Sequence, residues 1–378
     1  MQSIKTWAGV DVSAAKLAAR RRQDGKDEVE TFENTPDGHR KLIKWLGRQA
    51  RVCMEATGVY HLQLALALVA AGVEVMVVNP RVAKDFAGAL SNRSKTDKVD
   101  TAVLLEYVVR MEFVAWQAPR PAVLELRELG RRISELVRAS VEEKNRLHAR
   151  NASGLSRTVI RDIGQHIVQL QKRIQQIESS AVEVVMGDAL LQEQFDLIRK
   201  ARGFGRRTAL LLLTELAVLD PTMTVRQLVA HAGLDPRVYE SGTSVQKVVR
   251  ISKVGNARIR AILYMNALSA IRHDRGARLF FAQLVARGKK RMQALVAVMR
   301  KLLHGIWTVL QRRVPYDSAV LFAASLAKAE SSDSAAAAPQ PQSGEDHPQG
   351  RSEAEELREQ LEPRSTKATH RRKRSKAA

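Results

Sequence analysis

The feature that most constrains the fold is an apolar stripe in the middle of the chain. Between residues 121 and 195, apolar side chains recur at alternating intervals of three and four. They are Leu126, Leu129, Ile133 and Leu136, then Ile163, Ile167, Leu170, Ile174, Ile177 and Ala181. This spacing follows one face of an α-helix, so the stripe predicts two long helices that meet near residues 151–154 as a helical hairpin or coiled coil. The stripe suits a packing seam and a self-association surface equally well.

Before the stripe, short apolar runs alternate with helical patterns. Strands are predicted at residues 6–12, 28–32, 51–54 and 73–78, and helices at residues 37–46, 59–71 and 97–111, with a polar loop at 91–96. Mixed strands and helices in this order are typical of an α/β domain.

After the stripe, the pattern is mostly helical. Helices are predicted at residues 209–219, 225–231, 256–273 and 293–311, with basic or glycine-containing loops between them. Beyond residue 326 the chain is rich in Ser, Ala, Pro, Gln and Glu, and it carries a basic cluster at residues 371–374. That composition predicts a disordered, basic-ended tail. The predicted boundaries are therefore 1–118, 119–198, 199–326 and 327–378.

The positive charge is concentrated in one segment. The chain carries 62 basic and 40 acidic side chains, a net charge of +22. Residues 1–118 contribute +3 and residues 119–198 contribute +1, whereas residues 199–313 contribute +18. Because that third segment is also rich in Leu, Val and Ala, it is predicted to be folded. A folded basic segment beside two nearly neutral ones indicates a surface for nucleic-acid phosphates.

Other classes of protein fit poorly. The only cysteine is Cys53, which excludes a disulfide scaffold. The first residues show no secretory signal, and the most apolar stretch, residues 62–78, is interrupted by Gln63, Gly72 and Glu74. A soluble cytoplasmic protein without membrane spans is expected.

Four acidic residues stand out by position in the first segment. Asp11 lies at the end of a predicted strand, Glu55 follows another, and Asp97 and Asp100 lie one turn apart on a predicted helix. Clustered carboxylates repel one another unless a cation neutralises them, and their hard oxygens suit Mg²⁺ or Mn²⁺. Taken singly, each acid is also explained as a helix cap or a surface charge.

The third segment carries a candidate phosphate-binding turn and a candidate nucleophile. Gly203 and Gly205 precede a helix together with Arg206 and Arg207, which resembles a helix-hairpin-helix phosphate site. Ser241 lies in a polar loop, and Ser244 is a less favoured neighbour. The basic residues around this loop are Arg237, Lys247, Arg250, Lys253, Arg258 and Arg260. A serine needs such charge stabilisation, or a base, to attack a phosphate.

A set of motifs in order resembles one family. They are GVDVS at residues 9–13, MEATGVY at 54–60, VVNP at 77–80, KTDKVD at 95–100, GFGRRTA at 203–209, AGLDP at 232–236 and ISKVGNARIR at 251–260. Together with the SG pair at 241–242, they resemble the DEDD transposases of the insertion-sequence one-ten family, which are bridge-RNA-guided serine recombinases related to Piv-like DNA invertases.

This resemblance implies a fold, a site and partners. It implies a ribonuclease-H-like (RuvC-like) first domain in which Asp11, Glu55, Asp97 and Asp100 are catalytic and bind Mg²⁺ (or Mn²⁺), followed by a helical coiled-coil middle and a mostly α-helical transposase domain with Ser241 as catalytic nucleophile. It further implies donor and target DNA, a structured non-coding guide RNA, a homotetramer built as a dimer of dimers, and a bacterial protein that joins the nucleoid when active.

Two other functions stay open at this point. The first is a Holliday-junction-type DEDD endonuclease, in which water is the nucleophile and the serine is structural. The second is an architectural nucleic-acid-binding protein without enzymatic activity.

Overall fold

The structure is a computed structural model that describes residues 6–56, 58–90, 97–154, 156–237, 240–241, 245–246 and 249–336. The side chains of residues 97–98, 240–241, 245–246 and 330–336 lie outside this description. By its contacts the chain divides into two compact units, Met1–Leu326 and Ala327–Ala378.

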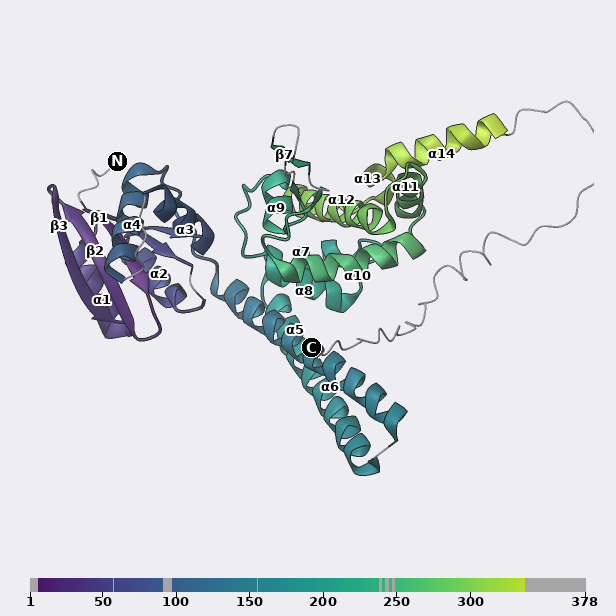
Figure 1. Cartoon of the computed structure of the whole chain (residues 1–378), viewed down its shortest axis with the longest axis horizontal. Coiled ribbons are helices and arrows are strands. Elements are labelled where there is room, and N and C mark those ends of the chain that lie inside the picture. Colours follow the sequence, from purple (N-terminus) through teal and green to yellow (C-terminus); the bar gives the residue numbers. More distant parts are fainter. Residues whose placement is uncertain are drawn as a thin grey trace, which may run out of the picture. The chain divides into compact units, whose positions relative to one another are not determined.

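The first part of the chain forms a five-stranded mixed sheet with four helices (Figure 1). The elements are β1 (Thr6–Val12), β2 (Lys16–Gln23), β3 (Lys26–Glu33), α1 (Pro36–Leu46), β4 (Ala50–Glu55), α2 (His61–Ala70), β5 (Glu74–Val78), α3 (Pro80–Ala89) and α4 (Asp97–Arg110). The strand order is β3-β2-β1-β4-β5. β1 runs antiparallel to β2 and parallel to β4, and β4 is parallel to β5. This mixed α/β arrangement is consistent with a ribonuclease-H-like fold.

The two faces of the sheet are covered by different helices. Alternate residues of a strand point to opposite faces. Val10 and Met54 belong to the core cluster that includes Leu42 of α1 and Leu64 of α2. Cys53 belongs instead to the cluster that includes Leu104 and Leu105 of α4 and Ala83 of α3. The sheet therefore has α1 and α2 on one face and α3 and α4 on the other.

In the first part of the chain, the structure adds β2 and α3, which the sequence patterns did not predict. β2 reads KLAARRRQ, and its run of arginines hides the apolar alternation of a strand. Those charges are matched across the hairpin, because Arg22 bonds Asp27 at 2.6 Å and Arg21 bonds Glu28 at 2.5 Å. Opposite charges on facing strands stabilise a sheet, so β2 is recognised only once its partner is known.

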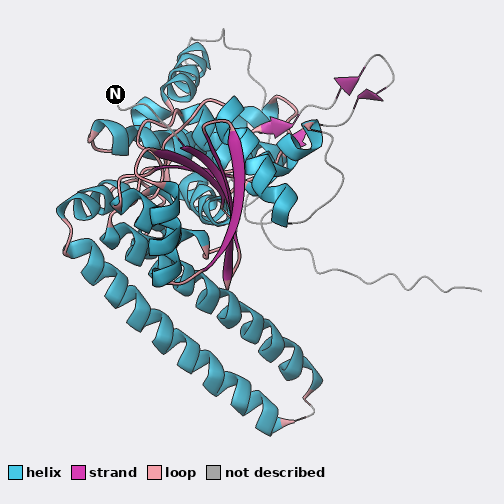
Figure 2. Cartoon of the chain, turned by 90° about the vertical axis from the view of Figure 1, so that its left-hand side faces the viewer, coloured by secondary structure: helices cyan, strands magenta, loops and turns pink. Residues whose placement is uncertain are grey.

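The remainder of the described chain is mostly helical. Its helices are α5 (Pro121–Ser153), α6 (Arg157–Met186), α7 (Ala189–Arg199), α8 (Arg206–Leu216), α9 (Val225–His231), α10 (Ala257–His273), α11 (Arg275–Ala286), α12 (Arg291–Arg312), α13 (Ser318–Leu321) and α14 (Ala323–Ala336). Figure 2 shows α5 and α6, the two long helices, side by side as a hairpin. Their buried residues include Leu126 and Ile133 of α5 and Ile167 and Leu170 of α6, so the predicted stripe is the seam between them.

Four very short strands interrupt the helices between α9 and α10. They are β6 (Pro236–Arg237), β7 (Glu240–Ser241), β8 (Val245–Gln246) and β9 (Arg250–Ile251). β6 pairs with β9, and β7 pairs with β8, both antiparallel. Residues 236–251, here called the serine arm, thus leave the helical core on one strand of a pair and return on the other.

The expected disorder beyond residue 326 does not begin where predicted, because α14 continues to Ala336. This stretch contains several alanines, which have the highest intrinsic helix propensity. The rest of the predicted tail, residues 337–378, lies outside the described residues. Among the helices that the structure describes, none is long and apolar enough to cross a membrane.

Candidate functional site

Two of the four predicted acids lie near the ends of neighbouring parallel strands, because Asp11 is the last but one residue of β1 and Glu55 is the last residue of β4. Gly9 pairs with Cys53 and Val10 with Met54, so the next residues, Asp11 and Glu55, continue the same register. Residues in register on adjacent strands point to the same face of a sheet. For Asp11 and Glu55 this is the face that Cys53 shares with α4. Both residues are half-buried.

Helix α4 lies very close to β1 because Gly9 has no side chain. A Cβ atom built at Gly9 would overlap the backbone oxygen of Thr101 and the backbone nitrogen of Leu105, and it would lie 2.8 Å from the Cβ of Leu104. A glycine is therefore required where the helix crosses the strand. Thr101 is fully buried at this crossing.

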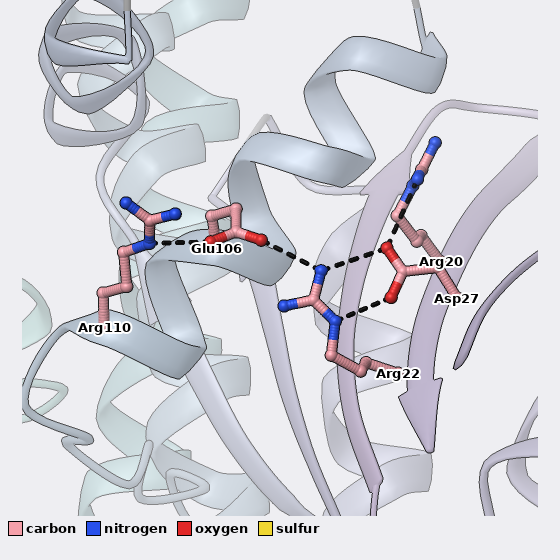
Figure 3. Close-up of polar contacts among 5 residues, drawn as sticks. All are labelled: Arg20, Arg22, Asp27, Glu106 and Arg110. Atoms are coloured by element: carbon pink, nitrogen blue, oxygen red, sulfur yellow. Dashed lines mark hydrogen bonds and ion pairs between the residues drawn. The ribbon is translucent and has the colours of Figure 1, made fainter. Parts of the chain in front are cut away.

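A charged network fixes the other end of α4 on the sheet (Figure 3). Arg22 of β2 bonds Glu106 of α4 at 3.0 Å and also bonds Asp27 of β3 at 2.6 Å. Arg110 bonds Glu106 at 2.7 Å from the next turn. Because Arg22 is the register partner of Trp7, Glu106 lies toward the start of β1, whereas Thr101 and Leu105 lie at Gly9. α4 consequently runs opposite to β1.

The electrostatics of this network favour the ionised acids. Hydrogen bonding from Arg22 lowers the pKa of Asp27 despite partial burial. Burial raises the pKa of Glu106, but hydrogen bonds from Arg22 and Arg110 outweigh it, and the pKa falls below its usual value. Both carboxylates stay charged at neutral pH and hold α4 in place.

The direction of α4 brings its first turn to the end of the sheet at which Asp11 and Glu55 lie. Asp97 begins the helix and Asp100 lies on the same face, one turn before Leu104. One turn advances 5.4 Å along a helix, from Gly9 toward Asp11. The backbone therefore brings the positions of all four acids to one end of β1 and β4. Among the described side chains, which exclude Asp97, there is no group of three metal-ligating residues.

The motifs around the serine arm close its base. Lys253 N–H donates to the Gly233 carbonyl at 3.1 Å, and Ser252 Oγ bonds the Asp235 carboxylate at 2.5 Å. Asn256 N–H donates to the His231 carbonyl at 2.7 Å. Two backbone hydrogen bonds and one side-chain hydrogen bond therefore join the HAGLDP segment at 231–236 and the ISKVGNARIR motif. These three bonds, here called the clasp, hold the two ends of the arm together.

The candidate nucleophile lies within that arm. Ser241 is on β7, where it pairs with Val245 of β8. Its side chain lies outside the described residues, as do Gly242, Ser244 and Lys247. The four acids come from the sheet and the serine comes from the helical part, so the two halves of the candidate site belong to different regions of the chain.

A turn that contains Gly203 and Gly205 precedes α8. Gly203 has φ +92°, in the region that favours glycine, and Gly205 precedes α8 without a side-chain cap. Arg206 is exposed. Arg207 pairs with Glu178 of α6, and a second bond between the same side chains measures 3.0 Å. Arg206 is thus better placed than Arg207 to meet a phosphate.

Two predicted phosphate contacts face each other across the base of the arm. Arg237 and Arg250 are direct register partners on β6 and β9, and both are exposed. The register therefore places two guanidinium groups opposite each other at the base of the arm. Lys253 is also exposed, and its φ of +54° is unusual for a residue with a side chain.

The last two predicted contacts have protein partners. Arg260 Nη1 donates to the Ala232 carbonyl at 2.9 Å, which ties α10 to the clasp. Arg258 Nε lies 3.8 Å from a carboxylate oxygen of Glu215, and Glu215 is only 2% exposed.

Glu215 also marks a charged group that sequence reasoning missed. It is the single acid in the apolar run of residues 209–219, and that isolation is the signal that could have found it. Around it lie Arg127, His231 and Arg258, and the charge of Glu215 acts on the pKa of Arg127 and on that of His231. Arg127 comes from α5, far away in sequence, so no local pattern links these residues.

Comparison with known proteins identifies the class and then the family. A family model described as "Transposase" matches residues 8–150, and a second, "Transposase IS116/IS110/IS902 family", matches residues 196–282. The first match spans the sheet and α5, and the second spans the clasp and the serine arm, so together they cover most of the described chain. The protein is a transposase. It belongs to the IS110 family of insertion-sequence transposases.

Individual relatives agree with this assignment. The chain is 26% identical over 325 residues to the "Pilin gene-inverting protein" of Moraxella bovis, which spans 84% of this chain and 99% of the relative. It is 28% identical over 116 residues to the "Insertion element IS110 uncharacterized 43.6 kDa protein" of Streptomyces coelicolor, which spans 31% of this chain and 28% of the relative. The chain is accordingly an enzyme of DNA recombination.

Proposed function

We propose that this transposase cleaves and rejoins DNA strands through a covalent phosphoserine at Ser241. The Oγ atom of Ser241 forms a bond to phosphorus while the bond from phosphorus to the leaving DNA oxygen breaks. The serine proton leaves Oγ, and the leaving DNA oxygen gains a proton. A DNA hydroxyl then attacks the phosphoserine and restores both the serine and a phosphodiester, so no net hydrolysis occurs.

The observation that carries the acidic half of the proposal is the geometry of α4. Asp11 and Glu55 lie near the ends of adjacent parallel strands on the face that α4 covers, and the first turn of α4 carries Asp97 and Asp100. Four carboxylates of this kind fit Mg²⁺ or Mn²⁺. When bound, such an ion would polarise the phosphodiester and neutralise the developing charge.

The serine half is supported by the clasp. The bonds from Lys253 to Gly233 and from Ser252 to Asp235 fix both ends of the arm that carries Ser241. Arg237, Arg250 and Lys253 gather positive charge at its base, which suits a pentavalent phosphate. Because the acids and the serine belong to separate regions, we propose that one active site combines the sheet of one protomer with the arm of another.

The assembly and the guide are carried over from the family resemblance. We propose a homotetramer in which α5 and α6, acting as a coiled coil, help to join protomers. A structured guide RNA would select donor and target DNA, and the +18 balance of residues 199–313 is compatible with two nucleic-acid partners. The full-length match to a pilin gene-inverting protein makes inversion a second outcome of the same strand chemistry.

The decisive experiment is to trap the covalent adduct. The protein is incubated with its guide RNA, substrate DNA and Mg²⁺, then denatured, and protein–DNA adducts are separated by electrophoresis. We expect the wild type and Ser244→Ala, the matched control, to form adduct and Ser241→Ala to form none. Nicking at full rate by Ser241→Ala would instead identify water as the nucleophile, as in a junction-resolving endonuclease.

The acidic half is tested in parallel with Asp11→Ala. Removing one of four repelling carboxylates should leave the metal-free protein folded, so we expect an unchanged melting temperature together with loss of adduct. Full activity in this variant would favour the architectural function. A fall of many degrees in the melting temperature would indicate a structural role for Asp11.

A further inference from the structure

A buried carboxylate lies where four helices meet. Glu215 of α8 is 2% exposed. Its carboxylate accepts a hydrogen bond from Asn256 Nδ2 at 2.6 Å, and Arg258 Nε lies 3.8 Å away. Asn256 also caps α10 through the backbone N–H groups of Arg258 and Ile259. Glu215 therefore holds the start of α10, directly after the clasp.

Helix α5 brings Arg127 to this carboxylate, with Arg131 beside Arg127. Gly130 of α5 packs directly on Thr214 of α8, and a Cβ built at Gly130 would lie 2.6 Å from the Thr214 hydroxyl oxygen. Arg127 and Arg131 lie three residues before and one residue after Gly130, one turn apart on the same side of α5. The close helix contact brings Arg127 within electrostatic reach of Glu215 and of Arg131.

These two arginines are incompletely satisfied by the protein. The Nε atoms of Arg127 and Arg131 are buried, and neither has a hydrogen-bond partner in the described part of the chain. Arg131 Nη1 does bond Glu128 at 3.0 Å, but the Glu128 side chain is 63% exposed. Burial lowers the pKa of Arg127, and the neighbouring charge of Arg131 lowers it further. A buried N–H group without an acceptor costs free energy.

The balance of charge in this group, here called the arginine nest, is positive. Arg127 and Arg258 lie near the buried Glu215, and Arg131 pairs with the exposed Glu128, so three guanidinium groups face two carboxylates. Burial lowers the pKa of His231, so His231 adds little positive charge. Guanidinium groups bind phosphate oxygens in two-point contacts, and one phosphodiester offers acceptors to several of them at once.

We propose that the arginine nest binds a backbone phosphate of the DNA that the serine arm engages. The inference rests on the proposed function and adds a contact to it. The nest adjoins the residues that close the arm, because Asn256 joins Glu215 to the His231 carbonyl. A phosphate bound there would fix the DNA relative to the arm, and it would contact the nest from the side on which Arg131 and Arg258 are 23% and 44% exposed.

The test is Arg127→Met in the full chain, with Arg132→Met as the matched control. Methionine keeps an unbranched chain without the charge, and Arg132 lies on the same helix with a 47% exposed side chain that pairs with Glu135. Binding of a fluorescent DNA duplex is measured by anisotropy over a range of salt concentrations. We expect affinity to fall about tenfold and the salt slope to fall by about one for Arg127→Met, with no change for the control.

The melting temperature of the DNA-free protein separates this function from a structural one. Arg127→Met removes the repulsion from Arg131, but it also removes a cation near the buried Glu215. The melting temperature therefore shows at which temperatures the variant is folded, and affinity is measured there. Unchanged affinity and salt slope, whatever the melting temperature, would overturn the proposal. If Arg127→Met does not fold, the DNA affinity and the salt slope are measured for Arg258→Gln instead. The Arg258 side chain is 44% exposed, so this variant is expected to fold.

Two further measurements distinguish failure of this inference from failure of the proposed function. The same titrations with single-stranded RNA should show a smaller effect, and a loss confined to RNA would overturn the assignment to DNA. Ser241→Ala is included as well, because it should bind the duplex like the wild type while forming no adduct. Arg127→Met could bind DNA like the wild type while adduct formation still depends on Ser241. That pair of results would overturn the phosphate contact at the arginine nest and would leave the proposed function unaffected.

Discussion

At the scale of single residues, Gly9 decides how closely α4 approaches the sheet. A methyl group at this position would meet helix backbone, which cannot move aside as a flexible side chain can. We expect Gly9→Ala to destabilise the sheet region by roughly 1–3 kcal/mol or more. Gly88→Ala is the control, since a Cβ at Gly88 of α3 meets nothing within 4 Å, and it should be neutral or stabilising by about 0.5–1 kcal/mol.

The single cysteine provides the readout for this prediction. Cys53 is fully buried on the face covered by α4, and burial raises the pKa of its thiol to about 12. Thiol reagents should therefore react with the wild type only when α4 opens. We expect faster labelling in Gly9→Ala and wild-type rates in Gly88→Ala. Equal rates in the two variants would show that the close approach contributes little.

At the scale of elements, the network in Figure 3 makes the attachment of α4 sensitive to acid. The pKa values of Asp27 and Glu106 are lowered in the folded protein. Their stabilisation is therefore complete above the unfolded-state values of about 4 and is lost as the pH falls through the folded-state values. Glu106→Gln should cost on the order of 1 kcal/mol at neutral pH and flatten the acid dependence.

Urea unfolding at neutral and acidic pH, followed through Cys53 labelling, measures this effect. Glu112→Gln serves as control, because Glu112 is an exposed acid just beyond the end of α4. The wild type and the control should lose stability together as the pH is lowered. An acid dependence in Glu106→Gln as steep as in the wild type would mean that other carboxylates dominate.

Elements were predictable from the sequence where local signals were strong. β1 covers residues 6–12 and α9 covers residues 225–231, as expected, and α9 begins with a capping box at Thr224 and Gln227. β2 was missed because its stability comes from charge pairs with β3 rather than from its own apolar pattern. Propensity is a weak guide wherever such partners decide.

The sequence predicted which residues form the candidate site, but it did not predict the contacts that hold those residues in place. Asp11 and Glu55 could be expected at strand ends, yet only the register makes them neighbours. The clasp depends on bonds such as Lys253 to Gly233, and the arginine nest joins Arg127 to Glu215. These contacts link residues far apart in sequence, and a single sequence contains no period or spacing that reports them.

At the scale of the whole molecule, the location of charge predicts how DNA binding depends on salt. Each phosphate contact releases counterions, so the logarithm of affinity should fall by about 0.9 per contact for each unit in the logarithm of salt concentration. We expect a steep slope in the full chain. A chain ending at residue 336 should keep most of it, because residues 337–378 carry nine basic and seven acidic residues and so contribute only +2 to the net charge of +22. DNA affinity that does not change with salt concentration, or a salt dependence that disappears when the tail is removed, would contradict the assignment of DNA binding to residues 199–313.

The bonds at the base of the serine arm also bear on how such enzymes diversify. Asp235 bonds Ser252, and Gly233 bonds Lys253. Because these bonds join the two ends of the arm, we expect changes of length between them to leave the helices α9 and α10 folded. The length of the arm could then change during evolution while the helices that carry it stay the same.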